Sequence, residues 1–168
     1  MIRNSLLIAM LALVLAACSD RSAPSSESGF VPSKQTPALV VETFQGGKFD
    51  LAEHRGKWVV VNFWATWCAP CLKEIPDFNA FAKSRKDVRF IGLAYEEITR
   101  EDMSAFLKDH PIDYPFAIID VYNPPEHFET PRGLPMTVLI APGGKVSKTF
   151  LGPVTASDIE AAMSVNPR

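Results

Sequence analysis

Residues 58–71 read WVVVNFWATWCAPC. Three consecutive valines flanked by aromatic residues predict a buried central strand over 57–64. After it, apolar residues recur every three or four positions and predict a helix over 69–84. Cys68 and Cys71 therefore lie between the end of a buried strand and the first turn of a helix. Two cysteines at this spacing can form and break a disulfide, which predicts thiol–disulfide exchange.

The two cysteines are expected to play different parts. The positive end of a helix stabilises a thiolate, so we expect a lowered pKa for Cys68 and assign it as the attacking thiolate. Cys71 lies one helical turn deeper and would resolve the mixed disulfide. The alternative for the pair is a structural zinc site, which needs two more ligands. The three histidines lie far from the motif, so no metal is predicted.

The first residues have the pattern of an export signal. A basic Arg3 precedes a short apolar run that ends in small residues before Cys18. This predicts a lipoprotein signal peptide over 1–17 and lipidation of Cys18; the alternative is a plain secretory peptide with Cys18 incidental. Residues 18–37 are rich in Ser, Pro and charge and predict a flexible tether. The protein would face the periplasm, anchored to the inner or the outer membrane.

Composition limits the remaining possibilities. Residues 38–168 have the size of one domain. The chain is 47% hydrophobic with a net charge of −2, so it lacks the basic surface that nucleic-acid binding requires. A domain exported to an oxidising compartment must either oxidise its partners or be kept reduced by a dedicated electron donor.

The rest of the domain alternates strands and helices. Residues 39–51 predict a hairpin around the Gly46-Gly47 turn, and Ser157 is expected to cap a last helix. A loop at 120–134 either borders the active site or is a surface connection, and we favour the second reading. The order β-β-β-α-β-α-β-β-β-α predicts an α/β fold with a mixed sheet and helices on both faces. The further predicted elements are strands at 88–94, 116–119, 136–140 and 146–151, and a helix from Thr99 to before Pro111.

Three segments make the chain resemble the TlpA/ResA-type thiol–disulfide oxidoreductases of the thioredoxin superfamily. They are 63–71 (FWATWCAPC), 74–76 (EIP) and 133–135 (GLP). The resemblance implies a thioredoxin-like fold with an N-terminal β-hairpin extension, a Cys68–Cys71 redox disulfide and no cofactor. It also favours the reductant direction.

The resemblance also gives Glu74 a part in tuning the pKa of Cys71 or in accepting its proton. A carboxylate one turn from a thiol can do both, whereas the alternative is an exposed helix glutamate. The strand residue Asn62 stands where cytosolic thioredoxins carry an acid, and an amide cannot accept the proton. Glu74 is therefore the better candidate base.

A substrate-binding surface is implied around the same motif. In the superfamily the proline at Pro135 is cis and packs against the cysteine pair; the alternative is a trans loop proline. Because proline lacks an N–H group, the backbone of Leu134 would be free to pair with an extended substrate. Trp67 is expected to form an apolar contact surface for substrate, and the alternative for Trp67 is packing.

These observations predict an envelope thiol–disulfide oxidoreductase that acts on exposed cysteines or disulfides of proteins. As a reductant it would serve cytochrome c haem-attachment cysteines or copper-site cysteines. Its electron donor would be a membrane thiol transporter of the DsbD/CcdA type. The rival functions are a disulfide-introducing oxidase, a Cu(I)-binding assembly module with Met136 nearby, and a peroxidase.

Overall fold

The computed structural model describes residues 36–165. The predicted signal peptide, Cys18 and nearly all of the tether lie outside the described residues. The predicted order of strands and α-helices is confirmed, and a short 3-10 helix, η1, is added after the hairpin. The elements are β1 (Val40–Glu42), β2 (Lys48–Asp50), η1 (Leu51–His54), β3 (Trp58–Trp64), α1 (Ala69–Ser84), β4 (Val88–Tyr95), α2 (Arg100–Phe106), β5 (Phe116–Ile119), β6 (Met136–Ile140), β7 (Val146–Leu151) and α3 (Ala156–Val165).

The five-stranded sheet has the order β5-β4-β3-β6-β7. Strands β3, β4 and β5 run parallel, whereas β6 and β7 pair antiparallel. The predicted mixed sheet is thereby confirmed. All seven residues of β3 are buried because strands flank it on both sides and both of its faces are covered. Because β6 runs antiparallel to β3, the carboxyl end of β3 meets the beginning of β6. This brings residues 64–68 close to residues 134–136.

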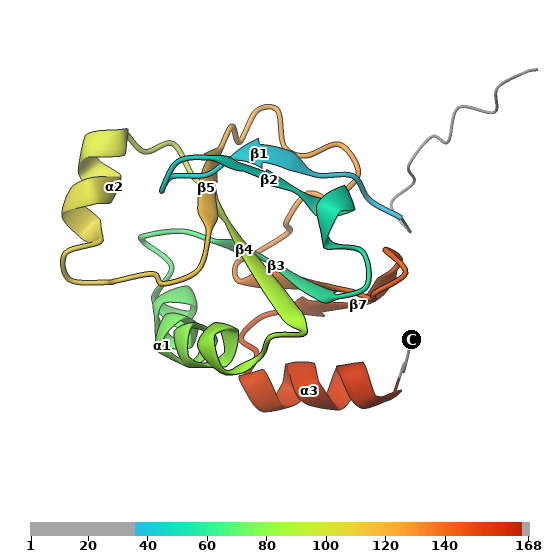
Figure 1. The fold of residues 1–168 in the computed structure, drawn as a ribbon. Helices are drawn as coiled ribbons and strands as arrows, with labels where there is room; N and C mark the ends of the chain where they lie inside the picture. The colour runs from blue at the N-terminus through green and yellow to red at the C-terminus, as the bar shows by residue number, and fades with distance from the viewer. Residues whose placement is uncertain (1–35, 166–168) are drawn as a thin grey trace, which may run out of the picture. The chain divides into compact units, whose positions relative to one another are not determined.

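The two faces of the sheet are covered differently (Figure 1). Helices α1 and α3 pack on one face, where Phe78 and Ile159 join a cluster with Val60 and Phe90. The hairpin, η1 and part of the 120–134 loop cover the other face. The second face is thus covered mainly by the two hairpin strands and the loop, together with the short helix η1.

The N-terminal hairpin is closed by the predicted glycine turn. Gly46 and Gly47 have φ angles of 93° and 85°, a region that residues with a Cβ rarely adopt. The hairpin is tied to the sheet because the Phe44 N–H donates to the Phe116 carbonyl over 2.7 Å. The two strands thus sit beside β5 rather than standing free.

The start of the last helix differs from the prediction. The helix begins at Ala156, and Thr155 rather than Ser157 caps it. The Thr155 hydroxyl accepts from the Asp158 N–H, while the Asp158 carboxylate accepts from the Thr155 N–H over 2.9 Å. This reciprocal capping box fixes the helix start one turn before Ile159 enters the core. Across residues 36–165, no helix has the length and apolarity needed to cross a membrane.

Candidate active site

Cys68 and Cys71 form a disulfide at the start of α1. Cys68 is the N-cap of the helix, and its sulfur accepts from the Cys71 N–H over 3.3 Å. Both residues are buried, with exposed fractions of 4% for Cys68 and 1% for Cys71. After reduction, the Cys68 sulfur would face the positive end of α1, which favours a thiolate there.

A buried acid that the sequence analysis did not single out holds the loop before Cys68. Glu96 follows β4 directly after Tyr95 and accepts from Thr66 through both carboxylate oxygens. The distances are 2.6 Å from the Thr66 N–H and 2.8 Å from its hydroxyl. Because β3 and β4 are parallel neighbours, the residues at their carboxyl ends meet at the same edge of the sheet. Once β3 and β4 are known to be neighbours, that rule indicates Glu96.

Glu74 lies one turn after Cys71 on α1 and is buried, with 5% of its surface exposed. The exposed-glutamate alternative is therefore wrong. Its Oε1 accepts from the Val154 N–H over 2.6 Å. Burial raises the pKa of Glu74 to about 7, and the hydrogen bond from Val154 opposes this rise. A carboxyl group with this pKa can both accept and release a proton near neutral pH.

A cavity of about 670 Å³ opens beside Glu74. It lies between the first turns of α1 and the segment that leads into α3. Pro70, from the centre of the cysteine motif, forms part of the wall. The lining residues are Pro70, Lys73, Glu74, Asp77, Pro153, Val154, Thr155 and Ser157. Glu74 thus borders this cavity although its side chain is almost completely buried.

The Leu134–Pro135 peptide bond is cis. Pro135 is buried, whereas Leu134 is half-buried and packs against the cluster that contains Cys68 and Cys71. The antiparallel pairing of β6 with β3 positions this segment beside the motif. The structure thus brings Leu134 and Pro135 to the disulfide, although 63 residues separate Cys71 from Leu134 in the sequence.

The two tryptophans around the motif have opposite environments. Trp64 is fully buried and meets Phe116 edge to face, with ring centroids 5.8 Å apart. Trp67 is 70% exposed, directly before Cys68. Plain packing therefore does not explain Trp67, and an exposed aromatic side chain beside the disulfide is a suitable contact for a partner protein.

Two residues next to the site belong to the core. Asn62 is buried and donates to the Thr137 hydroxyl over 2.9 Å, which ties β3 to β6. Met136 is also buried, on the face of the sheet covered by the hairpin. Its thioether is therefore not presented at the surface beside the cysteines.

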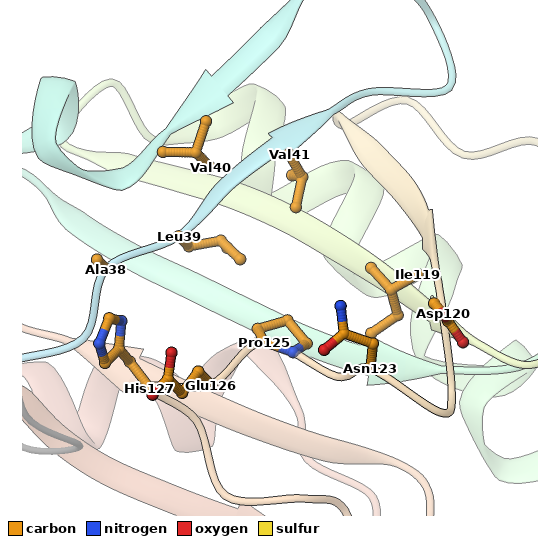
Figure 2. Close-up of a pocket in the computed structure, with 10 residues that line it drawn as sticks. All are labelled: Ala38, Leu39, Val40, Val41, Ile119, Asp120, Asn123, Pro125, Glu126 and His127. Atoms are coloured by element: carbon orange, nitrogen blue, oxygen red, sulfur yellow. The ribbon is translucent and has the colours of Figure 1, made fainter.

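The loop at 120–134 meets the N-terminal hairpin. Residues 123–127 of the loop face residues 38–41 across a cavity of about 370 Å³, drawn in Figure 2. The cavity is lined by Ala38, Leu39, Val40, Val41, Ile119, Asp120, Asn123, Pro125, Glu126 and His127. None of these residues belongs to the cysteine site, which agrees with a structural connection for this part of the loop.

The arrangement described above has counterparts in known proteins. A family model described as the AhpC/TSA family matches residues 32–150. The chain belongs to this family. Within it, the chain is 33% identical over 135 residues to a thiol-disulfide oxidoreductase ResA of Bacillus cereus, covering 76% of this chain and 73% of that protein. The ResA protein of Bacillus subtilis is 30% identical over 139 residues, or 77% of this chain and 72% of the relative.

Solved structures extend the same comparison. A thiol:disulfide interchange protein of the thioredoxin family from Chlorobium tepidum is similar with a TM-score of 0.64 at 27% identity, covering 80% of this chain and 96% of the other. A secreted disulfide oxidoreductase of Mycobacterium tuberculosis shares the fold with a TM-score of 0.63 at 20% identity, covering 79% and 98%. This AhpC/TSA family member is therefore a ResA-like thiol–disulfide oxidoreductase with a thioredoxin-like fold, as the sequence predicted.

Proposed function

We propose that the protein is a lipid-anchored reductant that faces the periplasm and transfers two electrons from Cys68 and Cys71 to disulfides of exported proteins. The observation that carries the proposal is the buried Glu74 one helical turn after a cysteine pair at the start of α1. A reductant needs one stabilised thiolate and one buried thiol that can lose its proton on demand. The position of Cys68 at the start of α1 and the burial of Glu74 one turn after Cys71 support both.

The first step is attack by the Cys68 thiolate on one sulfur of the target disulfide. A Cys68–target bond forms, the target disulfide breaks, and one target cysteine leaves as a thiolate that takes up a proton. The positive end of α1 favours the charged form of Cys68 before attack. Trp67 and the Leu134 backbone lie where an extended target segment could be held.

The second step is attack by Cys71 on the Cys68 sulfur. Glu74 takes the Cys71 proton, the Cys68–Cys71 bond forms, and the second target cysteine leaves as a thiolate. A carboxyl group with a pKa of about 7 is matched to this transfer at neutral pH. Glu74 can then return the proton to a thiol when the disulfide is reduced again.

The similarity to ResA proteins supports a proposal for the substrate class and the electron donor. We assign haem-attachment cysteines of apocytochrome c, or copper-site cysteines of an oxidase-assembly protein, as the targets. In an oxidising compartment the oxidised enzyme must be reduced again, and a membrane thiol transporter of the DsbD/CcdA type is the proposed donor. Lipidation at Cys18 would hold the domain at the membrane near that donor.

The reduction potential of the Cys68–Cys71 couple tests the direction. The full-length protein is equilibrated against glutathione and dithiothreitol buffers, and the oxidised fraction is measured by thiol alkylation. A potential near that of thioredoxin, roughly −270 mV, supports the reductant. A value near that of strong periplasmic oxidants, roughly −120 mV, would overturn it in favour of a disulfide-introducing enzyme.

A further inference from the structure

Two polar side chains approach one point of β4 on the face covered by α1. A Cβ atom at Gly92 would lie 3.0 Å from Trp64 Nε1 and 3.3 Å from Tyr114 Cε2. Gly92 pairs with Asn62 on one side and with Phe116 on the other, so this point lies in the middle of the sheet. The glycine leaves the room in which the indole N–H and the phenol ring come together.

Four buried side-chain atoms have no hydrogen-bond partner among the described residues. They are Trp64 Nε1, the Tyr114 hydroxyl, Glu74 Oε2 and His110 Nδ1. Trp64 is fully buried, and Tyr114 is only 2% exposed. Buried polar groups in folded proteins are nearly always hydrogen-bonded, to protein or to ordered water. Of the four, Trp64 and Tyr114 meet at Gly92, so their unpartnered atoms are the first to explain.

The segment before β5 is tied to α1, the helix that carries Glu74. The Asn79 side chain accepts from the Asp113 N–H over 2.8 Å and donates to the Pro111 carbonyl over 2.9 Å. Tyr114 follows Asp113 directly and packs in the same core cluster as Val154, the hydrogen-bond partner of Glu74. Burial, and secondarily the negative charge of Glu74, raise the pKa of Tyr114 far above its ordinary range.

The unpartnered atoms of Trp64, Tyr114 and Glu74 are complementary in hydrogen bonding. An indole N–H can only donate, a phenol hydroxyl can donate and accept, and a carboxylate oxygen can only accept. One water molecule could accept from Trp64 and donate to Glu74 while exchanging a hydrogen bond with Tyr114. Buried waters typically make about three hydrogen bonds of this kind.

We propose that one internal water bridges Trp64 Nε1, the Tyr114 hydroxyl and Glu74 Oε2, and that Tyr114 is thereby a positioning residue for the carboxyl group that serves Cys71. The link to catalysis rests on the proposed function of Glu74, but the water site itself does not. The site completes the hydrogen bonding of Glu74: Val154 holds one oxygen, and the water holds the other. Tyr114 would thus stabilise the carboxylate against burial.

Other titratable groups near Glu74 are accounted for. Lys73 and Asp77 lie on α1 and line the outer cavity, and the Asp77 carboxylate is engaged by the Ala156 N–H over 2.7 Å. Cys71 lies one turn earlier on α1. The segment at 153–157 contributes no titratable side chain to the cavity wall. Tyr114 is therefore the group to change in order to test the buried oxygen of Glu74.

The experiment is a titration of the Glu74 side-chain carboxyl by ¹³C NMR in the full-length, oxidised protein. Tyr114→Phe removes the hydroxyl and keeps the ring. The expected result is an upward shift of the Glu74 midpoint by about half a pH unit or more, because the carboxylate loses a stabilising partner. An unchanged midpoint overturns the proposal.

Tyr95→Phe is the matched control. Tyr95 also loses a hydroxyl, which donates to the Val121 carbonyl over 3.4 Å, but its ring packs against Phe63 on the opposite face of the sheet. In Tyr95→Phe, the midpoint of the Glu74 titration should equal that of the unmodified protein. Equal shifts in Tyr95→Phe and Tyr114→Phe would overturn the proposal. Trp64→Phe should raise the midpoint as Tyr114→Phe does.

A second readout separates this proposal from the catalytic one. The rate of resolution of the mixed disulfide is measured against pH for Glu74→Gln and for the unmodified protein. If Glu74→Gln leaves that profile unchanged, the proton-acceptor function fails, while the NMR midpoint in Tyr114→Phe still decides the water site. If the pH profile changes in Glu74→Gln and the Glu74 midpoint shifts in Tyr114→Phe, Tyr114 acts on the reaction through Glu74.

Discussion

Both carboxylate oxygens of Glu96 accept hydrogen bonds from Thr66, one from its N–H and one from its hydroxyl. Thr66 is two residues before Cys68, and Glu96 is buried at the carboxyl end of β4. The loop that presents Cys68 is thus fixed from a neighbouring strand as well as by its own helix. The position of the Cys68 sulfur thus depends on a residue 28 positions away in the sequence.

Replacing Glu96 should therefore loosen the loop. Glu96→Ala leaves two donors of Thr66 without their partner, and the expected loss of stability is about 1–3 kcal/mol. Urea unfolding measures this loss. Glu96→Gln is the matched control, because its amide can accept from the N–H and donate to the hydroxyl, and most of the stability should return. Equal stability of Glu96→Ala and the unmodified protein would contradict this function of Glu96.

The raised pKa of Glu74 makes stability depend on pH. In the folded protein the carboxyl keeps its proton up to a pH of about 7, whereas in the unfolded chain it loses it near its ordinary value of 4.5. Stability should therefore fall as the pH rises from about 4.5 to about 7, and then level off. The full loss is at most about 3 kcal/mol.

Glu74→Gln removes the titrating group and should abolish this part of the pH dependence. Denaturant unfolding at pH 5 and pH 8 makes the comparison. The variant should gain stability over the unmodified protein at pH 8 and little at pH 5. A variant that still loses the same stability between these values would show that another group is responsible.

Trp67 is expected to serve recognition without serving stability. Since its side chain is 70% exposed, Trp67→Ala should change the free energy of unfolding by less than about 0.5 kcal/mol. Exchange with a protein disulfide should slow about tenfold, as for loss of a contact worth about 1.4 kcal/mol. The rate with a small disulfide such as oxidised glutathione is the control. Equal slowing with both substrates would point to an effect on Cys68 instead.

The two cysteines should give different results when replaced. Cys71→Ser keeps the attacking thiolate but cannot resolve, so it should accumulate mixed disulfides with target proteins. Non-reducing electrophoresis after growth in the native host detects these complexes. Cys68→Ser should form none. Complexes from Cys68→Ser but none from Cys71→Ser would mean that the order of attack is reversed.

Cys18 provides a test of anchoring that is independent of the redox chemistry. If the residue is lipidated, the unmodified protein should fractionate with membranes, and Cys18→Ser should appear in the soluble fraction of the envelope. Ser19→Ala is the neighbouring control and should remain membrane-bound. Retention of Cys18→Ser in the membrane fraction would contradict lipid anchoring.

The sequence predicted the fold because its main signals are local. Three valines in β3, the apolar period of α1 and the glycine turn of the hairpin each specify an element within a few residues. The start of α3 was also readable locally, since Thr155 and Asp158 have the three-residue spacing of a capping box. Serine caps helices as well as threonine does, so a prediction from residue type alone placed the helix start at Ser157, which is wrong.

The site was harder to predict because its contacts cross the sequence. Helical spacing placed Glu74 on the face of Cys71, but its burial depends on the segment around Val154, 80 residues later. Glu96 contacts the motif only because β3 and β4 are parallel and their ends align. Such relationships need the strand order, which the hydrophobic pattern does not contain.

The N-terminal hairpin has a consequence for self-association. Gln45 donates through Nε2 to the Tyr114 carbonyl over 3.1 Å and accepts through Oε1 from the Phe116 N–H over 3.3 Å. With the bond from Phe44 to the Phe116 carbonyl, this occupies the outer backbone groups at the start of β5, the last strand on that side of the sheet. An open edge strand is a template on which further chains can add. The hairpin therefore covers the beginning of this edge, which should oppose the addition of a further strand there.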